Sequence, residues 1–385
     1  MLYKKHFPTI PAYLVTGAIA VGSIVAGFFL PVSISPVYWM VILTVYVFIA
    51  SWVPVWVILQ PRDFINVQIL YAGVALLVTG LVVAGIGGAH FGRPAFSMEQ
   101  VDEGQAAAGG IWPLLFVTVA CGAISGFHSL VSSGTTAKQC WMAKHARPTA
   151  FGGMLLEALL AAAVIATVAW AFTGTDPVGG FGEYRRLVYG PDSNPVLAFS
   201  LSCGRLCENA FGIPVALGSV FGILLVEGFV VTTLDTAIRL NRYLLEELWL
   251  VLLGVRMPSF MKRVWFNSAV AVALMFFMAS FNAADKIWPI FGSANQLLAA
   301  MALLVISMWL LARKRQAWFT LLPAAFMTVT TIAALVILFV DKYLPTGNVL
   351  LMVTDVILVL LAISMVVMAI RSLVARQWAQ TEVTE

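Results

Sequence analysis

The chain has 385 residues, of which 61% are hydrophobic and only 10% charged, and its formal net charge is +4. Globular domains contain about 25% charged residues, so this composition excludes an ordinary water-soluble domain. The composition predicts an all-α integral membrane protein embedded in the lipid bilayer. The basic residues are scattered, and they give no indication of a nucleic-acid partner.

Apolar runs of about 20 residues are typical of helices that cross a bilayer. When the N-terminus is placed inside, most of the 22 lysine and arginine residues fall on the inner side, as the positive-inside rule requires. We therefore expect both termini in the cytoplasm. The sequence predicts about ten spans, at about residues 10–30, 37–60, 65–88, 111–132, 151–172, 213–238, 264–282, 288–311, 317–340 and 348–370.

Glycines and hydroxyl side chains interrupt the fourth run. A helix that breaks at membrane depth can line a cavity, and the N-terminus of a half-helix suits a carboxylate. Small residues also allow close helix packing, and the sequence leaves that alternative open. His128 either titrates or hydrogen-bonds a neighbouring helix. The candidate substrate-binding residues are Gly122, Ser125, Gly126, Phe127, His128, Ser132, Ser133 and Thr135.

Two acidic residues, Glu227 and Asp235, lie eight positions apart in the sixth run and share a helix face. A carboxylate at the centre of a span costs about 2.5–3.5 kcal/mol, so such a group usually pairs with a cation or carries a proton. Thr232 and Thr233 add hard oxygen atoms beside Asp235. These four residues are candidates for ion or proton coupling. An internal ion pair between Asp235 and Arg239 is the alternative.

The eighth run begins with WPIFGSANQ, residues 288–296. We expect Pro289 and Gly292 to open this helix, while Asn295 and Gln296 need hydrogen-bond partners inside a bundle. These four residues are assigned to gating or to helix packing rather than to direct ligand contact.

No nucleotide-binding loop, metal-binding motif or catalytic triad order appears in the chain. We therefore expect neither an enzyme nor an ATP-driven motor, and predict no cofactor and no metal ion. Cys203 and Cys207 form the only close cysteine pair, and they either form a strained disulfide or remain free.

Four segments together resemble the carbon starvation protein A family, in the family's order and over about residues 10–315. They are WVPVWVILQPRDF, ACGAISGFHSLVSSGTT, TTLDTAIRLNRY and WPIFGSANQLLAAMALL. The resemblance implies a secondary transporter of the bacterial inner membrane that takes up peptides or small carboxylates such as pyruvate during carbon starvation. It also implies a coupling cation, with the proton favoured, and the inverted-repeat fold of the amino acid–polyamine–organocation superfamily.

Family members carry a Gly-Pro-rich break in helices that precede the resembled part, and residues 1–110 contain no such segment. The alternative function is therefore a truncated or non-transporting membrane subunit or sensor scaffold, whose site a second polypeptide completes. We expect a single transmembrane domain over residues 1–385 with a partial inverted-repeat fold. Its parts are three helices of an incomplete first repeat (10–88), a second repeat (111–311) that opens with the broken helix 111–136, and two peripheral helices (317–370).

Overall fold

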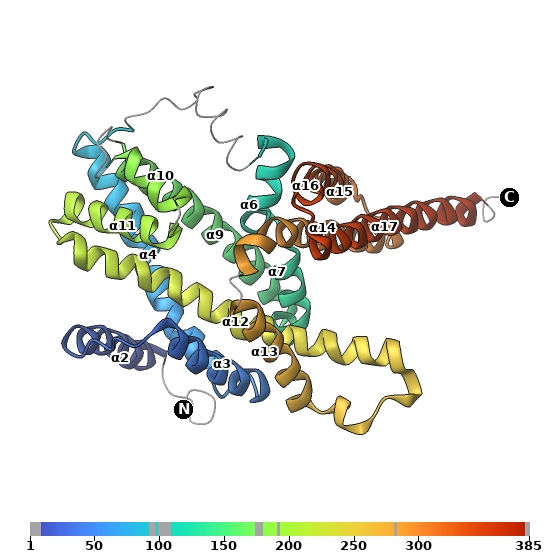
Figure 1. Ribbon diagram of the computed structural model, residues 1–385, viewed down its shortest axis with the longest axis horizontal. Coiled ribbons are helices and arrows are strands. Elements are labelled where there is room, and N and C mark those ends of the chain that lie inside the picture. Colours follow the sequence, from blue (N-terminus) through green and yellow to red (C-terminus); the bar gives the residue numbers. More distant parts are fainter. Residues whose placement is uncertain are drawn as a thin grey trace. The chain divides into compact units, whose positions relative to one another are not determined.

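The fold was obtained as a computed structural model of the whole chain (Figure 1). The residues that it describes are 9–91, 98, 109–173, 180–190, 193–280 and 283–381. Within these ranges all regular elements are helices, and seven helices are long and apolar enough to cross a membrane. The prediction of an all-α membrane protein is therefore confirmed.

The helices follow the apolar runs of the sequence. The seven long ones are α2 (Thr9–Phe29), α4 (Leu59–Ile86), α9 (Ala143–Ala171), α12 (Val215–Leu253), α14 (Ala283–Ala312), α15 (Trp318–Ile337) and α17 (Val349–Thr381). Two expected spans form shorter apolar helices, α3 (Pro36–Trp52) and α13 (Val264–Ser280). The fourth expected span is divided into η1 (Ile111–Leu115), α6 (Phe116–Ala123), α7 (Gly126–Val131), η2 (Ser132–Thr136) and α8 (Ala137–Gln139).

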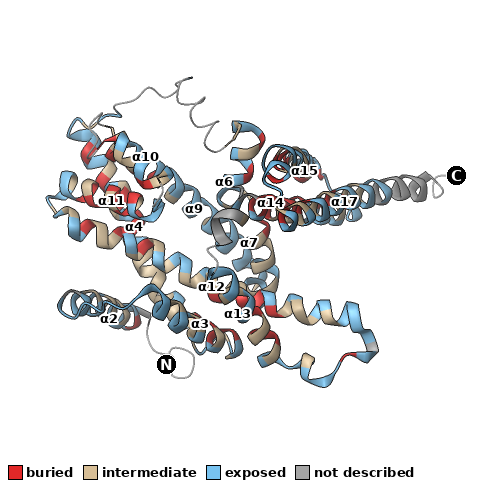
Figure 2. Ribbon diagram, viewed as in Figure 1, coloured by how far each residue is buried: buried red, intermediate tan, exposed pale blue. Residues whose placement is uncertain are grey.

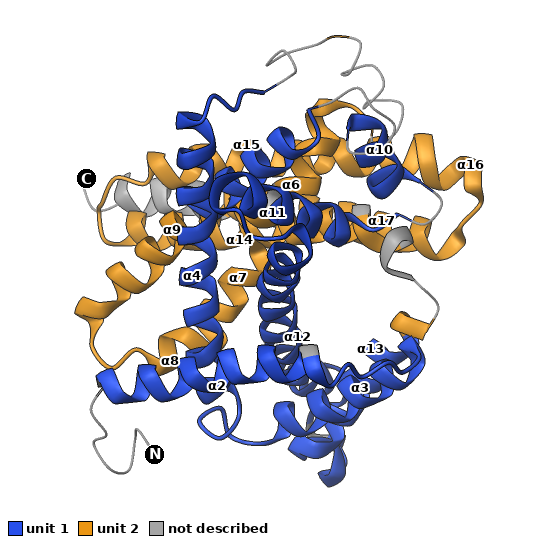
Figure 3. Cartoon of the chain, turned by 90° about the vertical axis from the view of Figure 1, so that its left-hand side faces the viewer, with its two compact units in different colours: residues 1–94, 159–277 blue, residues 95–158, 278–385 orange. Residues whose placement is uncertain are grey.

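The chain divides into two compact units, which Figure 3 colours separately. Unit 1 contains residues 1–94 and 159–277, and unit 2 contains residues 95–158 and 278–385. Besides its long helices, unit 1 holds α10 (Phe181–Tyr189), α11 (Pro195–Phe211), η3 (Gly254–Arg256) and η4 (Ser259–Lys262). Unit 2 also holds η5 (Leu338–Tyr343) and α16 (Leu344–Thr346).

Unit 1 is built around close contact between α11 and α12. A Cβ atom on Gly204 would lie 2.3 Å from the hydroxyl oxygen of Ser219, and one on Gly218 would lie 2.8 Å from the Cα atom of Gly204. Glycine is needed here because any side chain would push the two backbones apart. Next to this contact, α4 packs against both helices (Figure 1), and Leu206 and Leu225 are buried in the shared core.

Unit 2 is organised around α14, which contacts α6, α7, α15 and α17. Buried positions are frequent along α14 in Figure 2, whereas α2 of unit 1 is coloured almost wholly as exposed, as a lipid-facing helix would be. The expectation that Pro289 and Gly292 open this helix is wrong, because α14 is continuous from Ala283 to Ala312. Gly292 instead allows a close approach, since a Cβ atom there would lie 2.9 Å from the Val117 carbonyl oxygen.

Candidate functional site

A buried ion-pair network joins α3, α4 and α12 within unit 1. The Asp235 carboxylate on α12 is fully buried and pairs with the Arg62 guanidinium on α4. The Tyr46 hydroxyl on α3 accepts a hydrogen bond from Arg62 Nη1 at 2.7 Å and donates one to Asp235 Oδ2 at 3.2 Å. The Thr236 hydroxyl lies 3.4 Å from Asp235 Oδ1. The charges of Arg62 and Asp235 thus compensate each other, as buried charges require.

Arg62 is shared between two carboxylates that differ in their access to water. Its Nη2 atom lies 2.8 Å from Asp63 Oδ1, and the Asp63 side chain is 53% exposed, whereas that of Asp235 is 0% exposed. If Asp235 took up a proton, Arg62 would keep Asp63 as an ionic partner. The arrangement therefore lets one carboxyl change its charge without leaving the guanidinium unpaired.

A cavity of about 240 Å³ lies beside this network, between α4 and α12. Its polar wall comes from Asp63, Asn66, Thr232 and Thr236, and most of the remaining wall is apolar. Ligand pockets for drug-sized molecules span about 300–1,000 Å³, so this cavity suits a smaller molecule. Asp63 and Thr236 belong both to the wall and to the network, which connects the cavity to the buried ion pair.

The four residues predicted for coupling lie in different surroundings. Asp235 is the centre of the network, and Thr232 lines the cavity while its hydroxyl donates to the Gly228 carbonyl of its own helix at 2.8 Å. Thr233 and Glu227 are exposed and belong to neither feature. Because Arg62 and Tyr46 hold the carboxylate, Asp235 is not arranged as a ligand of a bare cation.

The alternative pairing of Asp235 with Arg239 is wrong, because Arg239 has other partners. Its Nη2 atom donates to the carbonyls of Ala50 and Val53, both at 2.6 Å, and Arg242 Nη1 donates to the Ser51 carbonyl at 2.9 Å. These carbonyls form the negative C-terminal end of α3, which favours cations. Both arginines lie beyond the expected span 213–238, but α12 continues past them and they are buried.

Sequence reasoning missed Arg62 and Tyr46. Arg62 falls between the expected spans 37–60 and 65–88, whereas in the structure it lies in the first turn of α4 with a side chain only 18% exposed. The signal was present, because the QPRDF segment places a charged pair directly ahead of a long apolar run. Tyr46 had no such signal, since an aromatic residue in an apolar helix is ordinary.

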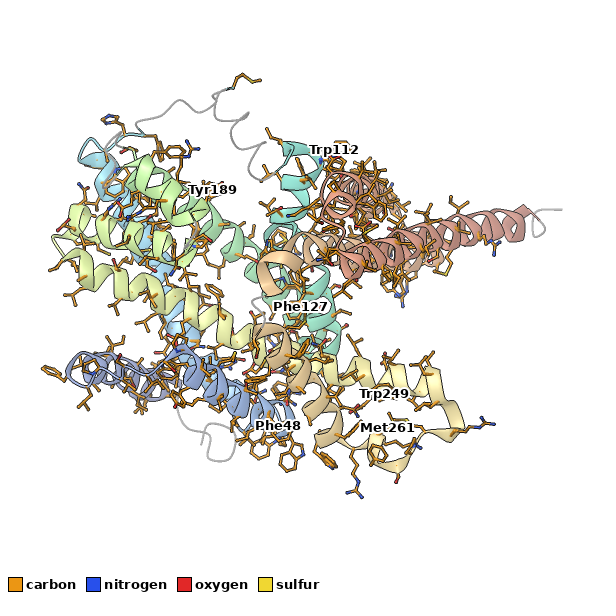
Figure 4. The ribbon with its side chains drawn as sticks, viewed as in Figure 1. Phe48, Trp112, Phe127, Tyr189, Trp249 and Met261 are labelled. Atoms are coloured by element: carbon orange, nitrogen blue, oxygen red, sulfur yellow. The ribbon has the colours of Figure 1, made fainter. Side chains whose placement is uncertain are left out.

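In unit 2, the helix is interrupted between α6 and α7, and Asn295 of α14 fills the interruption. Ser125 has an extended backbone (φ −105°, ψ 125°), and its hydroxyl accepts from the His128 N–H at 3.2 Å as an N-cap. Asn295 Oδ1 accepts from the Phe127 N–H at 2.8 Å and from the Ser125 hydroxyl at 3.2 Å. Two of the predicted polar segments therefore meet here. Figure 4 shows Phe127 on α7 at this position.

The other residues predicted for the broken helix do not form a ligand shell. Gly126 is buried against α14, whereas Gly122 and His128 are exposed. The hydroxyls of three residues donate to carbonyls of their own helix at 3.1, 3.1 and 2.8 Å; these are Ser132, Ser133 and Thr135. Such back-bonding satisfies a hydroxyl without a ligand.

Of the remaining gating candidates, Gln296 is buried and its Nε2 atom donates to the sulfur of Met327 at 3.3 Å. The side chain of Pro289 lies outside the described residues. In the part of the chain that the structure describes, no cluster of histidine, cysteine and acidic side chains could hold a metal ion.

The fold and these two clusters define a multi-pass membrane protein that keeps charged and polar groups between its helices. The chain belongs to the family described as Carbon starvation protein CstA, whose model matches residues 1–175 and 186–334. The residues of the ion-pair network and Ser125 and Asn295 all lie within the matched ranges.

Three curated relatives illustrate the similarity. The Peptide transporter CstA of Escherichia coli (strain K12) is 28% identical, over 75% of this chain and 48% of its own length. The Peptide transporter CstA of Bacillus subtilis (strain 168) is 28% identical, over 75% of this chain and 52% of its own length. The Pyruvate/proton symporter BtsT of Escherichia coli (strain K12) is 28% identical, over 75% of this chain and 49% of its own length. The chain spans about half the length of these relatives. No solved structure matches it.

Proposed function

We propose that this protein acts as a secondary transporter that takes up peptides or pyruvate together with protons across the bacterial inner membrane, with both termini in the cytoplasm. Its family and the names of its relatives, a peptide transporter and a pyruvate/proton symporter, support the substrate class. The observation that carries the coupling is the network of Tyr46, Arg62 and Asp235 beside a cavity. A role in carbon starvation is part of the same proposal.

In this mechanism Asp235 is the proton carrier. A proton that binds Asp235 neutralises the buried carboxylate and weakens its hold on Arg62. Asp63, which lies in the cavity wall, would then draw the guanidinium toward the cavity, where the carboxylate of pyruvate or of a peptide could pair with it. Return of Asp235 to its ionised form restores the internal ion pair and favours release of the substrate. Proton and substrate binding are thereby linked through one arginine.

In unit 2 we propose a substrate contact at the helix interruption. The Ser125 hydroxyl and the Phe127 N–H now donate to Asn295 Oδ1, and a carbonyl oxygen of a substrate bound there would accept the same two hydrogen bonds. Ser125→Ala should therefore raise KM for uptake, whereas Ser133→Ala should leave it unchanged, because Ser133 is exposed and donates to its own helix.

The test is uptake of radiolabelled pyruvate and of a labelled dipeptide by the purified full chain in proteoliposomes, with and without an inward proton gradient. The wild type should accumulate one of these substrates only when the gradient is present. Asp235→Asn should abolish gradient-driven accumulation but retain exchange of internal for external substrate. Arg62→Gln should abolish both.

Glu227→Gln is the matched control for Asp235→Asn, because Glu227 is an acid on the same helix but exposed and outside the network. It should transport like the wild type. Accumulation by the wild type that persists after the gradient is collapsed would contradict proton coupling. Uptake of neither substrate under any gradient would contradict the proposed substrate class.

A further inference from the structure

The helices that follow the family-matched region hold a second buried acid. Asp355 lies on α17 and is 1% exposed, and its Oδ1 atom has no hydrogen-bond partner among the described residues. Tyr343, at the end of η5, is fully buried, and its hydroxyl likewise lacks a described partner. Both residues lie beyond residue 334, where the match to the family ends. The mechanism proposed above uses neither of them.

These two groups are neighbours in unit 2. The segment η5, which ends at Tyr343, packs against α17, which carries Asp355. Tyr343 shares a buried apolar cluster with Ile290, Leu338 and Leu351. The acid and the phenol therefore lie together in surroundings that offer little else that is polar.

No described cation faces Asp355. Tyr343 is the titratable group beside it, and α15 and η1 carry no charged residue. On η5, Asp341 and Lys342 are exposed. The two charged residues of α14 lie outside the described side chains; they are Asp285 and Lys286.

A groove of about 220 Å³ leads to the acid. Asp355 is the one charged residue in its wall, and the others are apolar side chains of α15, η5 and α17; they are Val336, Phe339, Val340, Val356, Val359 and Leu360. Several of these are among the exposed apolar residues that a bilayer would surround, including Val340 and Leu360. A small hydrophobic molecule dissolved in the bilayer can therefore reach the carboxyl.

An ionised carboxylate without a partner is costly at this depth, because neither water nor a cation compensates its charge. The neutral acid avoids that cost and can hydrogen-bond to a phenol hydroxyl. Asp235 presents the opposite case, since Arg62 and Tyr46 compensate its charge. The two buried acids among the described residues, Asp235 and Asp355, should therefore differ in protonation.

We propose that Asp355, with Tyr343 beside it, forms a second proton-binding site that is reached from the bilayer through the groove. The site does not depend on the coupling assigned to Asp235. It would serve the C-terminal helices, in a part of the chain that the family match does not include.

Dicyclohexylcarbodiimide tests this proposal, because the reagent partitions into lipid and reacts with protonated carboxyl groups. The acid proton passes to a carbodiimide nitrogen, and the carboxyl oxygen forms a bond to the central carbon, which gives a stable adduct after rearrangement. The full chain in proteoliposomes should carry one adduct on Asp355 at neutral pH, located by peptide mass spectrometry. In the absence of substrate Asp235 stays paired with Arg62, so it should remain unlabelled and serves as the internal control.

Three comparisons make the test decisive. Labelling should be lost in Asp355→Asn, should decline about tenfold for each pH unit above the titration point of the acid, and should fail with a water-soluble carbodiimide. If Asp355→Asn does not fold, Tyr343→Phe keeps the acid while removing its neighbour's hydroxyl. In Tyr343→Phe, the pH at which labelling of Asp355 declines should differ from that in the wild type. An unlabelled Asp355 in the wild type, or labelling that does not change with pH, would overturn the proposal.

Discussion

Asn295 on α14 and Ser125 at the helix interruption are joined by a hydrogen bond of 3.2 Å between the amide oxygen and the hydroxyl. The same oxygen accepts the Phe127 N–H at 2.8 Å. A helix that starts within a bundle leaves N–H groups without intrahelical partners. Asn295 satisfies one of them from another helix, so the interruption depends on a residue remote in sequence.

Replacement of Asn295 by leucine should destabilise unit 2. Leucine has a similar volume but no acceptor, and an unsatisfied buried N–H costs about 1–3 kcal/mol. We expect a loss of this size in the free energy of unfolding, measured by titration of the detergent-solubilised protein with sodium dodecyl sulfate. Gln296→Met is the control. Gln296 is equally buried, but its amide donates only to a sulfur and its Oε1 atom has no described partner. An equal loss in both variants would contradict the capping role.

Gly126→Ala should also be destabilising, and Gly122→Ala should not. A Cβ atom at Gly126 would lie 2.3 Å from the Asn295 carbonyl oxygen and 2.3 Å from the Leu298 Cβ atom, whereas one at Gly122 would meet nothing within 4 Å. Overpacking of this kind costs about 1–3 kcal/mol. Thermal unfolding followed by loss of a monodisperse chromatography peak would separate the two variants. A stable Gly126→Ala protein would show that α7 can move away from α14.

Arg239→Gln should loosen α3 from α12. The change removes the guanidinium that donates to the Ala50 and Val53 carbonyls, and hydrogen bonds from charged groups contribute about 1.5–3 kcal/mol. Limited proteolysis should then cut the segment after α3 faster than in the wild type. Arg256→Gln is the control, since Arg256 is exposed, and its proteolysis should match the wild type. An unchanged rate in Arg239→Gln would show that Arg242 alone holds the end of α3.

Cys203 and Cys207 are free thiols, and neither should react in the folded protein. Both are buried, and burial raises the pKa of Cys203 to about 12 and also raises that of Cys207. Since the thiolate is the reactive form, alkylation by maleimide should stay slow even at mildly alkaline pH and become fast on denaturation. Cys121 and Cys140 are less buried and should react first. A peptide with a Cys203–Cys207 disulfide in unreduced digests would contradict this expectation.

The helices could be predicted from the sequence because a bilayer imposes a length and an apolar composition on every span. Helix ends were less predictable. The sixth run was expected to stop before Arg239 and Arg242, which are charged. In the structure the end of α3 satisfies both side chains, so the helix continues to Leu253. The charges alone predict an end of α12 at this point, and only the contact with α3 allows the helix to continue.

In the candidate site, one residue of each interacting pair could be predicted from the sequence. Asp235 and Asn295 were identified because polar residues in apolar runs need partners, but their partners were not. The local spacing predicts Arg239 as the ionic partner of Asp235, whereas the actual partner, Arg62, is 173 positions away in the sequence. Asn295 and Ser125 are 170 positions apart. Pairings over such distances depend on the packing of whole helices, about which residue spacing carries no information.

The glycine contact between α11 and α12 has a mechanical consequence. Where the Gly204 and Gly218 backbones touch, only short side chains such as those of Ser219 and Cys207 lie between α11 and α12, so we expect the two helices to move together. Gly73 of α4 also lies close to Leu225 of α12, but there the contact is with the end of a side chain rather than with backbone. Rotation of side chains such as Phe229 in the cavity wall would then change access to the cavity without separating α12 from α11.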